Sequence, residues 1–240
     1  MTRVLLTTTS FQDTPGKHHD LMAAAGYEIV RERGPLTEAR MLELAGEFDA
    51  FICGDDAITR AVIQKSLPRL KVISKYGIGL DKIDVTSATE FKIPVLFTPG
   101  VNHTTVAEHA FLLLLALERN FLFHTDSTRA GGWKRKTGFE LLGKTMGIVG
   151  LGRSGQAIAR RAAAFDMSIA YTTRTEKPES GFKYYPNAAA LAAQVDFLVV
   201  ITPGGAGTRH LINADVVNGI DLHEEVLPFS AITVVCRSAD

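Results

Sequence analysis

The order of apolar and polar positions along the chain predicts strands that alternate with helices at short spacing. Short apolar runs, such as 49–53, are followed by helical stretches, such as 59–66. This rhythm is typical of a parallel sheet with helices on both faces. Over residues 1–100 we expect strands at 3–9, 27–31, 49–53, 70–74 and 95–97 and helices at 17–25, 37–46, 59–66 and 85–91.

A long apolar helix separates these elements from a second set. We expect it to begin at a capping box formed by Thr105 and Glu108, and its apolar run through Leu117 predicts burial between packed surfaces. A polar connection at 126–143 follows. A doubly wound dinucleotide domain usually has about six strands, so this second set, with three clear strands and one weak one, should be short. The expected elements are strands from Met146, at 167–171, 196–201 and 229–236, and a helix at 188–193.

One stretch of the second set carries the strongest chemical signal, the spacing G-x-G-x-x-G between an apolar strand and a helix. Gly150 permits a tight turn, Gly152 lets a pyrophosphate approach the backbone, and Gly155 lets the helix pack on the strand. The amides and the positive dipole end of that helix attract anions. The flanking strand and helix favour dinucleotide binding over an ordinary glycine turn. The cofactor-binding residues predicted here are Gly150, Gly152, Arg153, Ser154 and Gly155.

The loop after the next strand bears on which cofactor binds. An NAD site carries an acid there, which bonds the ribose hydroxyls, whereas an Arg accommodates the 2′-phosphate of NADP. Here Thr173, Arg174 and Thr175 come first, and the first acid is Glu176. The phosphate affinity of Arg beside hydroxyl donors favours NADP(H) over NAD(H). The alternative, that Arg174 lies over the adenine of either cofactor, stays open.

Composition and charge argue against several other classes of protein. Lys and Arg together number 26, as do Asp and Glu, so the chain lacks the positive charge typical of nucleic-acid binding. The start is too polar after Leu6 for a signal peptide, and the run 110–117 is shorter than the roughly 20 residues that span a bilayer. Cys53 and Cys236 have no metal-site spacing and predict no disulfide framework. We expect a cytoplasmic protein without metal, membrane or nucleic-acid partner.

Three stretches, in order, resemble the D-isomer-specific 2-hydroxyacid dehydrogenases. They are 71–84 (KVISKYGIGLDKID), 98–109 with TPGVN and VAEH, and 142–155 (LGKTMGIVGLGRSG). The similarity runs from the N-terminus to about Val217 and points to the phosphoglycerate dehydrogenase-like branch. It implies an oxidoreductase that transfers a hydride between a nicotinamide cofactor and a small D-2-hydroxy acid or 2-oxo acid.

The resemblance also implies an architecture. It predicts an α/β protein with a flavodoxin-like substrate domain at 1–100. An incomplete, C-terminally truncated NAD(P)-binding Rossmann domain should occupy 101–240, with the active site between the two. Members of this family form dimers, so we expect a homodimer with the long helix near 107–120 contributing to its interface.

The same resemblance assigns substrate contacts to the first domain. Ile78 and Gly79 match the loop whose backbone amides hold the substrate carboxylate, and a glycine-rich loop suits that task. Tyr76 and Lys75 lie beside this loop. Lys75 either meets a substrate phosphate or is a solvated surface lysine.

Other residues of the matched segments receive lesser roles. Asp81 and Asp84 are interpreted as turn and cap residues rather than as catalytic acids. Thr202 and Pro203 match the loop on the nicotinamide side, where α/β sheets bind ligands, and Thr208 lies close by.

The end of the chain departs from the family pattern. The family uses an Arg for the carboxylate, and a Glu paired with a His as general acid/base. Arg237, after an apolar run, is a weak candidate for that Arg, and His223 stands in a poorly patterned stretch. The Glu and His have no counterpart in the sequence. Two interpretations stay open, a truncated or divergent C-terminus, or a catalytically inactive nucleotide-binding form.

Overall fold

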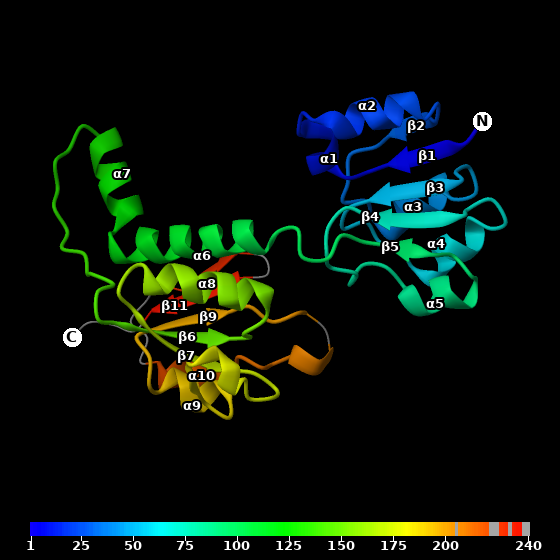
Figure 1. The fold of residues 1–240 in the computed structure, drawn as a ribbon. Coiled ribbons are helices and arrows are strands. Elements are labelled where there is room, and N and C mark those ends of the chain that lie inside the picture. Colours follow the sequence, from blue (N-terminus) through cyan, green and yellow to red (C-terminus); the bar gives the residue numbers. More distant parts are fainter. Residues whose placement is uncertain (205, 221–225, 230–231, 237–240) are drawn as a thin grey trace. The chain divides into compact units, whose positions relative to one another are not determined.

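The computed structural model places the chain in two compact units, Met1–Val101 and Asn102–Asp240, each with its own sheet (Figure 1). Arg237 and His223 lie outside the described part of the chain. The structure describes residues 1–204, 206–220, 226–229 and 232–236.

The first unit contains a five-stranded, all-parallel sheet in the order β2-β1-β3-β4-β5. This is the flavodoxin-like strand order, in agreement with the parallel sheet expected from the sequence. In the central strands Val4 pairs with Ala50, and Phe51 with Ile73. The elements are β1 (Arg3–Leu6), α1 (Thr9–Asp13), α2 (Lys17–Ala24), β2 (Glu28–Arg31), α3 (Glu38–Leu44), β3 (Ala50–Cys53), α4 (Arg60–Lys65), β4 (Val72–Lys75), α5 (Val85–Glu90) and β5 (Val95–Leu96).

The two faces of this sheet are packed differently. Phe51 and Ile73 are buried in a core that also contains Met41 of α3. Ala50 and Val72, one position away on the same strands, are only half-buried. Successive strand residues point to opposite faces, so one face carries the core and the other is more open. A hollow of about 580 Å³ lies on the open face, with a lining that includes Leu21, Met22, Ala50, Ile52, Val72 and Leu96.

The start of α5 is set by its capping residue. The Asp84 carboxylate accepts hydrogen bonds from the Ser87 amide at 2.8 Å and from the Ser87 hydroxyl at 2.7 Å. The hydroxyl and then the amide hold the pKa of Asp84 below its ordinary value. Asp81 lies in the turn before the helix. The prediction of turn and cap roles for these two acids is confirmed.

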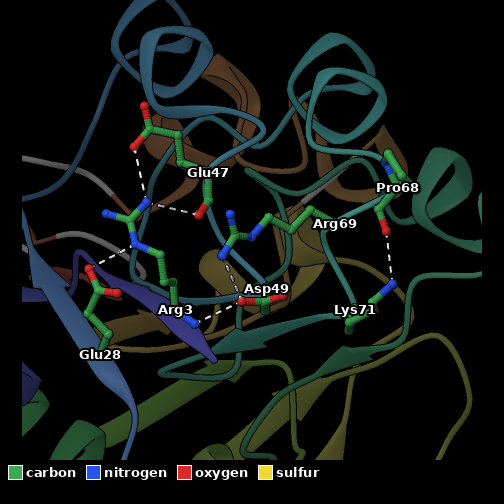
Figure 2. Close-up of polar contacts among 7 residues, drawn as sticks. All are labelled: Arg3, Glu28, Glu47, Asp49, Pro68, Arg69 and Lys71. Carbon is green, nitrogen blue, oxygen red and sulfur yellow. Dashed lines mark hydrogen bonds and ion pairs between the residues drawn. The ribbon is translucent and has the colours of Figure 1, made fainter. Parts of the chain in front are cut away.

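A group of charged side chains ties together the amino ends of the parallel strands (Figure 2). The Asp49 carboxylate accepts a hydrogen bond from the Arg3 amide at 2.8 Å and one from the Arg69 guanidinium at 3.4 Å. Arg3 also reaches the carboxylates of Glu28 and Glu47, at 2.9 and 3.3 Å. Parallel sheets bind ligands at the opposite edge, the carboxyl ends of the strands, so this group is structural.

The second unit contains, among the described residues, a six-stranded sheet in the order β10-β11-β9-β6-β7-β8. Strands β9, β6, β7 and β8 are parallel, whereas β11 is antiparallel to β9, and β10 to β11. The elements are α6 (His103–Glu118), α7 (Phe121–Arg129), β6 (Thr145–Val149), α8 (Arg153–Ala163), β7 (Ser168–Thr172), the 3-10 turn η1 (Pro178–Ser180), β8 (Lys183–Tyr184), α9 (Ala188–Ala192), β9 (Phe197–Val200), the 3-10 turn η2 (Ala206–Thr208), α10 (Ala214–Gly219), β10 (Val226–Phe229) and β11 (Ile232–Cys236).

Helices cover both faces of this second sheet. Phe111 of α6 and Ile158 of α8 share a core with Ile148 of β6. On the other face, Leu191 of α9 shares a core with Val149. Ile148 and Val149 are neighbours in one strand, so strand alternation divides them between the two cores. This is the α/β Rossmann-type architecture predicted from the sequence.

The long helix starts earlier than its sequence suggests. It begins at His103, with Asn102 at the cap, and the Asn102 carbonyl accepts the Val106 amide at 2.9 Å. The prediction of a capping box at Thr105 is therefore wrong. Glu108 instead pairs with Arg161 of α8 at 3.3 Å.

In the described part of the chain, one face of α6 is buried. Leu114 is buried, whereas Leu112 is 59% exposed, so the described single chain does not provide the packed surfaces expected on both sides of the helix. No helix in the described part of the chain is both long and apolar enough to span a membrane.

Other elements also differ from expectation, including the strand expected at 3–9, which ends at Leu6 before α1. The stretch 126–143 begins inside α7 rather than as a loop. The single strand expected at 229–236 falls on two antiparallel strands, β10 and β11, so the parallel strand-and-helix rhythm does not continue there. β8 was missed because a strand of two residues carries no detectable period.

Candidate functional site

The three glycines of the turn after β6 occupy positions with different steric demands. Gly150 has a φ of 106°, and a Cβ there would lie 2.5 Å from the Ile201 carbonyl oxygen. A Cβ on Gly155 would collide with the Gly150 carbonyl oxygen. Gly152 is exposed, and a Cβ there would meet nothing within 4 Å. Gly150 and Gly155 are thus required by the path of the backbone, whereas Gly152 leaves open space next to the backbone.

This turn lies where the carboxyl ends of β6, β7 and β9 meet. The Gly150 amide donates to the Thr172 carbonyl, at the end of β7, at 3.0 Å. The Thr202 methyl group, just after β9, is 3.1 Å from the position of a Cβ on Gly150. The fold therefore brings the glycine turn close to the segments 173–175 and 202–203, at the edge where doubly wound sheets bind ligands.

The first turn of α8 presents free backbone donors beside Gly152. The first helical bond runs from the Gln156 amide to the Gly152 carbonyl at 2.9 Å. Among the residues that the structure describes, no acceptor contacts the amides of Arg153 or Ser154. Free amides at the positive end of a helix dipole form an anion site, and the exposed Arg153 side chain adds positive charge near it.

The loop after β7 is folded tightly on its strand. The Thr173 hydroxyl donates to the Thr175 carbonyl at 2.6 Å. The hydroxyl of buried Tyr171 accepts the Lys177 amide at 2.7 Å. Arg174 lies exposed on this loop. Arg174 thus stands shortly after the end of β7 and is open to solvent.

Lys177 is a residue of this site that the sequence analysis missed. Its ammonium donates a hydrogen bond of 2.9 Å to the Leu151 carbonyl, inside the glycine turn. The side chain joins the loop after β7 to the turn after β6 and brings positive charge to the anion site. The sequence did contain a signal that could have identified it: a lysine shortly after Arg174, in a loop already predicted to bind the 2′-phosphate of the cofactor.

The residues predicted for the nicotinamide side lie together after β9. Thr202 is half-buried and Pro203 is exposed. The Thr208 hydroxyl donates to the Pro203 carbonyl at 2.7 Å, which closes the segment around η2.

In the first unit, the loop after β4 presents two more backbone donors. The Gly77 carbonyl accepts the amide and the hydroxyl of Thr98, at 3.0 and 3.1 Å, which fixes the loop. Within the described residues, the amides of Ile78 and Gly79 have no protein acceptor. Two free amides in a glycine-rich turn can hold an anion such as a carboxylate.

Lys75 and Tyr76 flank this loop in different environments. Only 5% of the Lys75 side chain is exposed, and its ammonium contacts Asp55 at 2.6 Å, so the interpretation as a solvated surface lysine is wrong. Tyr76 is 45% exposed, and its ring lies 5.6 Å from that of Phe11, centroid to centroid.

The hollow on the open face of the first sheet is separate from these loops. None of Lys75, Tyr76, Ile78 and Gly79 lines it, and it lies against the strands rather than at their carboxyl ends. Its size alone does not make it the candidate site, because its lining is predominantly apolar and offers no group of converging donors.

Fold and site together define an α/β protein whose second unit is a Rossmann-type domain with a glycine turn of the dinucleotide-binding kind. The family model described as "D-isomer specific 2-hydroxyacid dehydrogenase, NAD binding domain" matches residues 111–222. The glyoxylate reductase of Pyrococcus furiosus is 38% identical over 202 residues, which are 78% of this chain and 60% of that protein. The chain belongs to the D-isomer specific 2-hydroxyacid dehydrogenase family.

Solved structures agree with this assignment. The NADPH-dependent glyoxylate/hydroxypyruvate reductase of Sinorhizobium meliloti, in complex with NADP and malonate, has a TM-score of 0.72 at 32% identity. The match covers 91% of this chain and 68% of that one. A protein of Thermus thermophilus has a TM-score of 0.82 at 33% identity, over 91% and 70% of the two chains.

The relatives named here are similar to this chain over part of their length. The chain spans about 60% of the first curated relatives that it matches. Because those named are glyoxylate and hydroxypyruvate reductases, a special relation to phosphoglycerate dehydrogenases stays a prediction.

Proposed function

We propose that this chain binds a nicotinamide dinucleotide at the turn after β6 and takes part in hydride transfer between that cofactor and a small 2-oxo or 2-hydroxy acid. The observation that carries the proposal is the open space at Gly152 beside the free amides of Arg153 and Ser154. A bridging pyrophosphate requires such a cradle, with close backbone approach and donors at a helix start. When bound, the nicotinamide supplies or accepts the hydride.

We further propose a preference for NADP(H) over NAD(H). The loop after β7 carries Arg174 between Thr173 and Thr175, and no acid stands in the position that would bond the ribose hydroxyls. Lys177 adds a second positive charge to the same loop. Arg and hydroxyl donors suit a phosphate dianion, which supports this preference. The NADP found in the Sinorhizobium meliloti reductase is in keeping with it.

On the substrate side, the proposal gives the amides of Ile78 and Gly79 the task of holding the carboxylate. The loop is fixed by Thr98, so these donors are oriented before the substrate arrives. Glyoxylate and hydroxypyruvate are the substrates to test first, because the names of the relatives include them. Thr202, Pro203 and Thr208 would border the nicotinamide.

We also propose that the protein is a homodimer that uses the exposed side of α6 and the segment after it. Several large apolar side chains there are solvent-exposed in the single chain, an arrangement that marks interaction surfaces. They are Leu112 at 59%, Phe121 at 57%, Leu122 at 63% and Trp133 at 83%.

The test of the proposed activity is NADPH oxidation by the purified chain with glyoxylate, hydroxypyruvate or phosphohydroxypyruvate. Turnover that depends on both cofactor and 2-oxo acid supports the proposal. Tight cofactor binding without turnover on any of the three would overturn the catalytic part and leave a nucleotide-binding protein. Absence of cofactor binding would overturn the proposal as a whole.

A further inference from the structure

An ion pair between a buried lysine and an exposed aspartate stands beside the loop that holds Ile78 and Gly79. The ammonium of Lys75, the last residue of β4, donates to the Asp55 carboxylate at 2.6 Å and to the Gly54 carbonyl at 2.5 Å. The Lys75 side chain is 5% exposed, whereas that of Asp55 is 77% exposed. The cation is therefore inside the protein, and its counter-ion is at the surface.

Lys75 lies within reach of a substrate on that loop. Its Cε atom is 3.5 Å from the position of a Cβ on Gly77. Bond lengths along this path put the ammonium at most about 9 Å from the Ile78 amide. A phosphorylated three-carbon acid whose carboxylate rests on the Ile78 and Gly79 amides is long enough to span that distance.

A second acid, Asp56, follows Asp55 in the chain. Asp56 is fully buried, and its carboxylate accepts the Thr7 hydroxyl at 2.5 Å, the Leu36 amide at 2.7 Å and the Gly54 amide at 2.9 Å. These donors are all neutral groups. The carboxyl end of β3 therefore holds two acids close to a single lysine.

The pKa of the neighbouring Cys53 thiol shows which of these charges has the larger effect on that thiol. Burial raises the pKa of Cys53 to about 12, and the Asp56 carboxylate raises it further than the Lys75 ammonium lowers it. Thiolate formation is thus opposed in spite of the nearby lysine.

We propose that Asp55 neutralises Lys75 and so makes this loop selective for 2-oxo acids with a single negative charge over phosphorylated ones. The inference rests on the proposed function, and it assigns Asp55 as a specificity-determining residue. The Lys75 ammonium has three donors, and two are already engaged by Gly54 and Asp55. A phosphate dianion would have to displace the Asp55 carboxylate or lie beside it, and like charges at contact are strongly unfavourable.

The test replaces Asp55 by Asn, which removes the charge and keeps the shape. Calorimetric titration compares D-glycerate with D-3-phosphoglycerate on the full chain. The unchanged protein should bind glycerate at least as tightly as phosphoglycerate. Asp55→Asn should strengthen phosphoglycerate binding about fivefold, as expected for loss of one exposed ion-pair partner, with glycerate nearly unchanged. The ratio of kcat/KM for the two corresponding 2-oxo acids should shift in the same direction.

Matched variants separate this effect from general changes. Asp55→Glu keeps the charge, and Asp20→Asn removes an exposed charge on α2; both should leave the ratio of affinities unchanged. Adding Lys75→Met to Asp55→Asn should abolish the gain. Asp55→Ser removes the same charge and replaces the Asn variant if the latter does not fold.

The outcomes distinguish the two proposals. If the unchanged protein binds neither acid, this inference is overturned, and NADPH oxidation with a 2-oxo acid decides separately whether the proposed function stands. If it binds glycerate but prefers phosphoglycerate, or if Asp55→Asn leaves the ratio unchanged, the assignment of Asp55 alone is overturned.

Discussion

The ammonium of Lys177 donates a hydrogen bond of 2.9 Å to the carbonyl oxygen of Leu151, and this contact attaches the loop after β7 to the glycine turn. The two ends of the contact lie beside the two places where the proposed cofactor would place its phosphates. The pyrophosphate would lie at the start of α8, and the 2′-phosphate near Arg174. One lysine is thus positioned to support both.

Lys177→Met should weaken binding of NADPH and of NADH alike. The variant loses a positive charge and the bond that holds the turn, an effect worth about 1 kcal/mol, or roughly fivefold in each dissociation constant. Fluorescence titration of both cofactors measures it. Lys177→Arg keeps the charge and serves as the control. Unchanged affinity in the Met variant would show that the contact is only structural.

Arg174→Ala should discriminate between the cofactors. Its guanidinium would bind the 2′-phosphate, which only NADPH carries, and a charge-assisted contact of about 1.5–3 kcal/mol corresponds to a loss of roughly tenfold or more. NADH affinity should change little. The same titration tests this, and tighter binding of NADH than of NADPH by the unmutated protein would refute the NADP(H) preference.

Gly155→Ala and Gly152→Ala form a matched pair that separates folding from binding. A methyl group at 155 would collide with the Gly150 carbonyl, so we expect a loss of stability of about 3 kcal/mol in urea unfolding. A methyl group at 152 meets nothing within 4 Å, so stability should hold while NADPH affinity falls at least about tenfold. Normal NADPH binding by Gly152→Ala would contradict the site.

Asp49→Asn should make the free energy of unfolding less dependent on pH in the acid range. The Arg3 amide, followed by the weaker contact from Arg69, holds the pKa of Asp49 below its ordinary value of 3.8. A carboxyl group with a lowered pKa stabilises the folded state above pH 3.8, and that contribution is lost as the pH falls through its folded-state value. The variant should therefore be less stable than the original at pH 7, with the difference shrinking in acid. Urea unfolding at several pH values measures it; a difference that is the same at every pH would count against this account.

Leu112→Glu should disrupt the proposed homodimer. A charge in the middle of the exposed apolar side of α6 would have to be buried in the interface, which is strongly unfavourable. Light scattering should then find a monomer. Leu21→Glu places the same change at a side chain that is 71% exposed on α2, and it should leave the dimer intact. A monomeric unmutated protein would refute the proposal.

Much of the fold and part of the site could be predicted because they depend on short stretches of chain. The buried alternation around Phe51 and Ile148 follows from strand periodicity. The demand for glycine at 150 follows from the tight turn between a strand and a helix. The end of the sheet was harder to predict, because apolar residues at 232–236 indicate a strand without indicating its direction.

The sequence by itself determined the two sets of strands and helices, the glycine turn and the family, since each of these rests on local spacing or on matched motifs. Only the tertiary structure decided which distant residues meet. Lys177 reaches Leu151 across 26 positions, and Lys75 reaches Asp55 across 20, because neighbouring parallel strands bring their carboxyl ends to one edge. Such contacts depend on the path of the backbone and on side-chain length, and neither is written in the periodicity of a single segment.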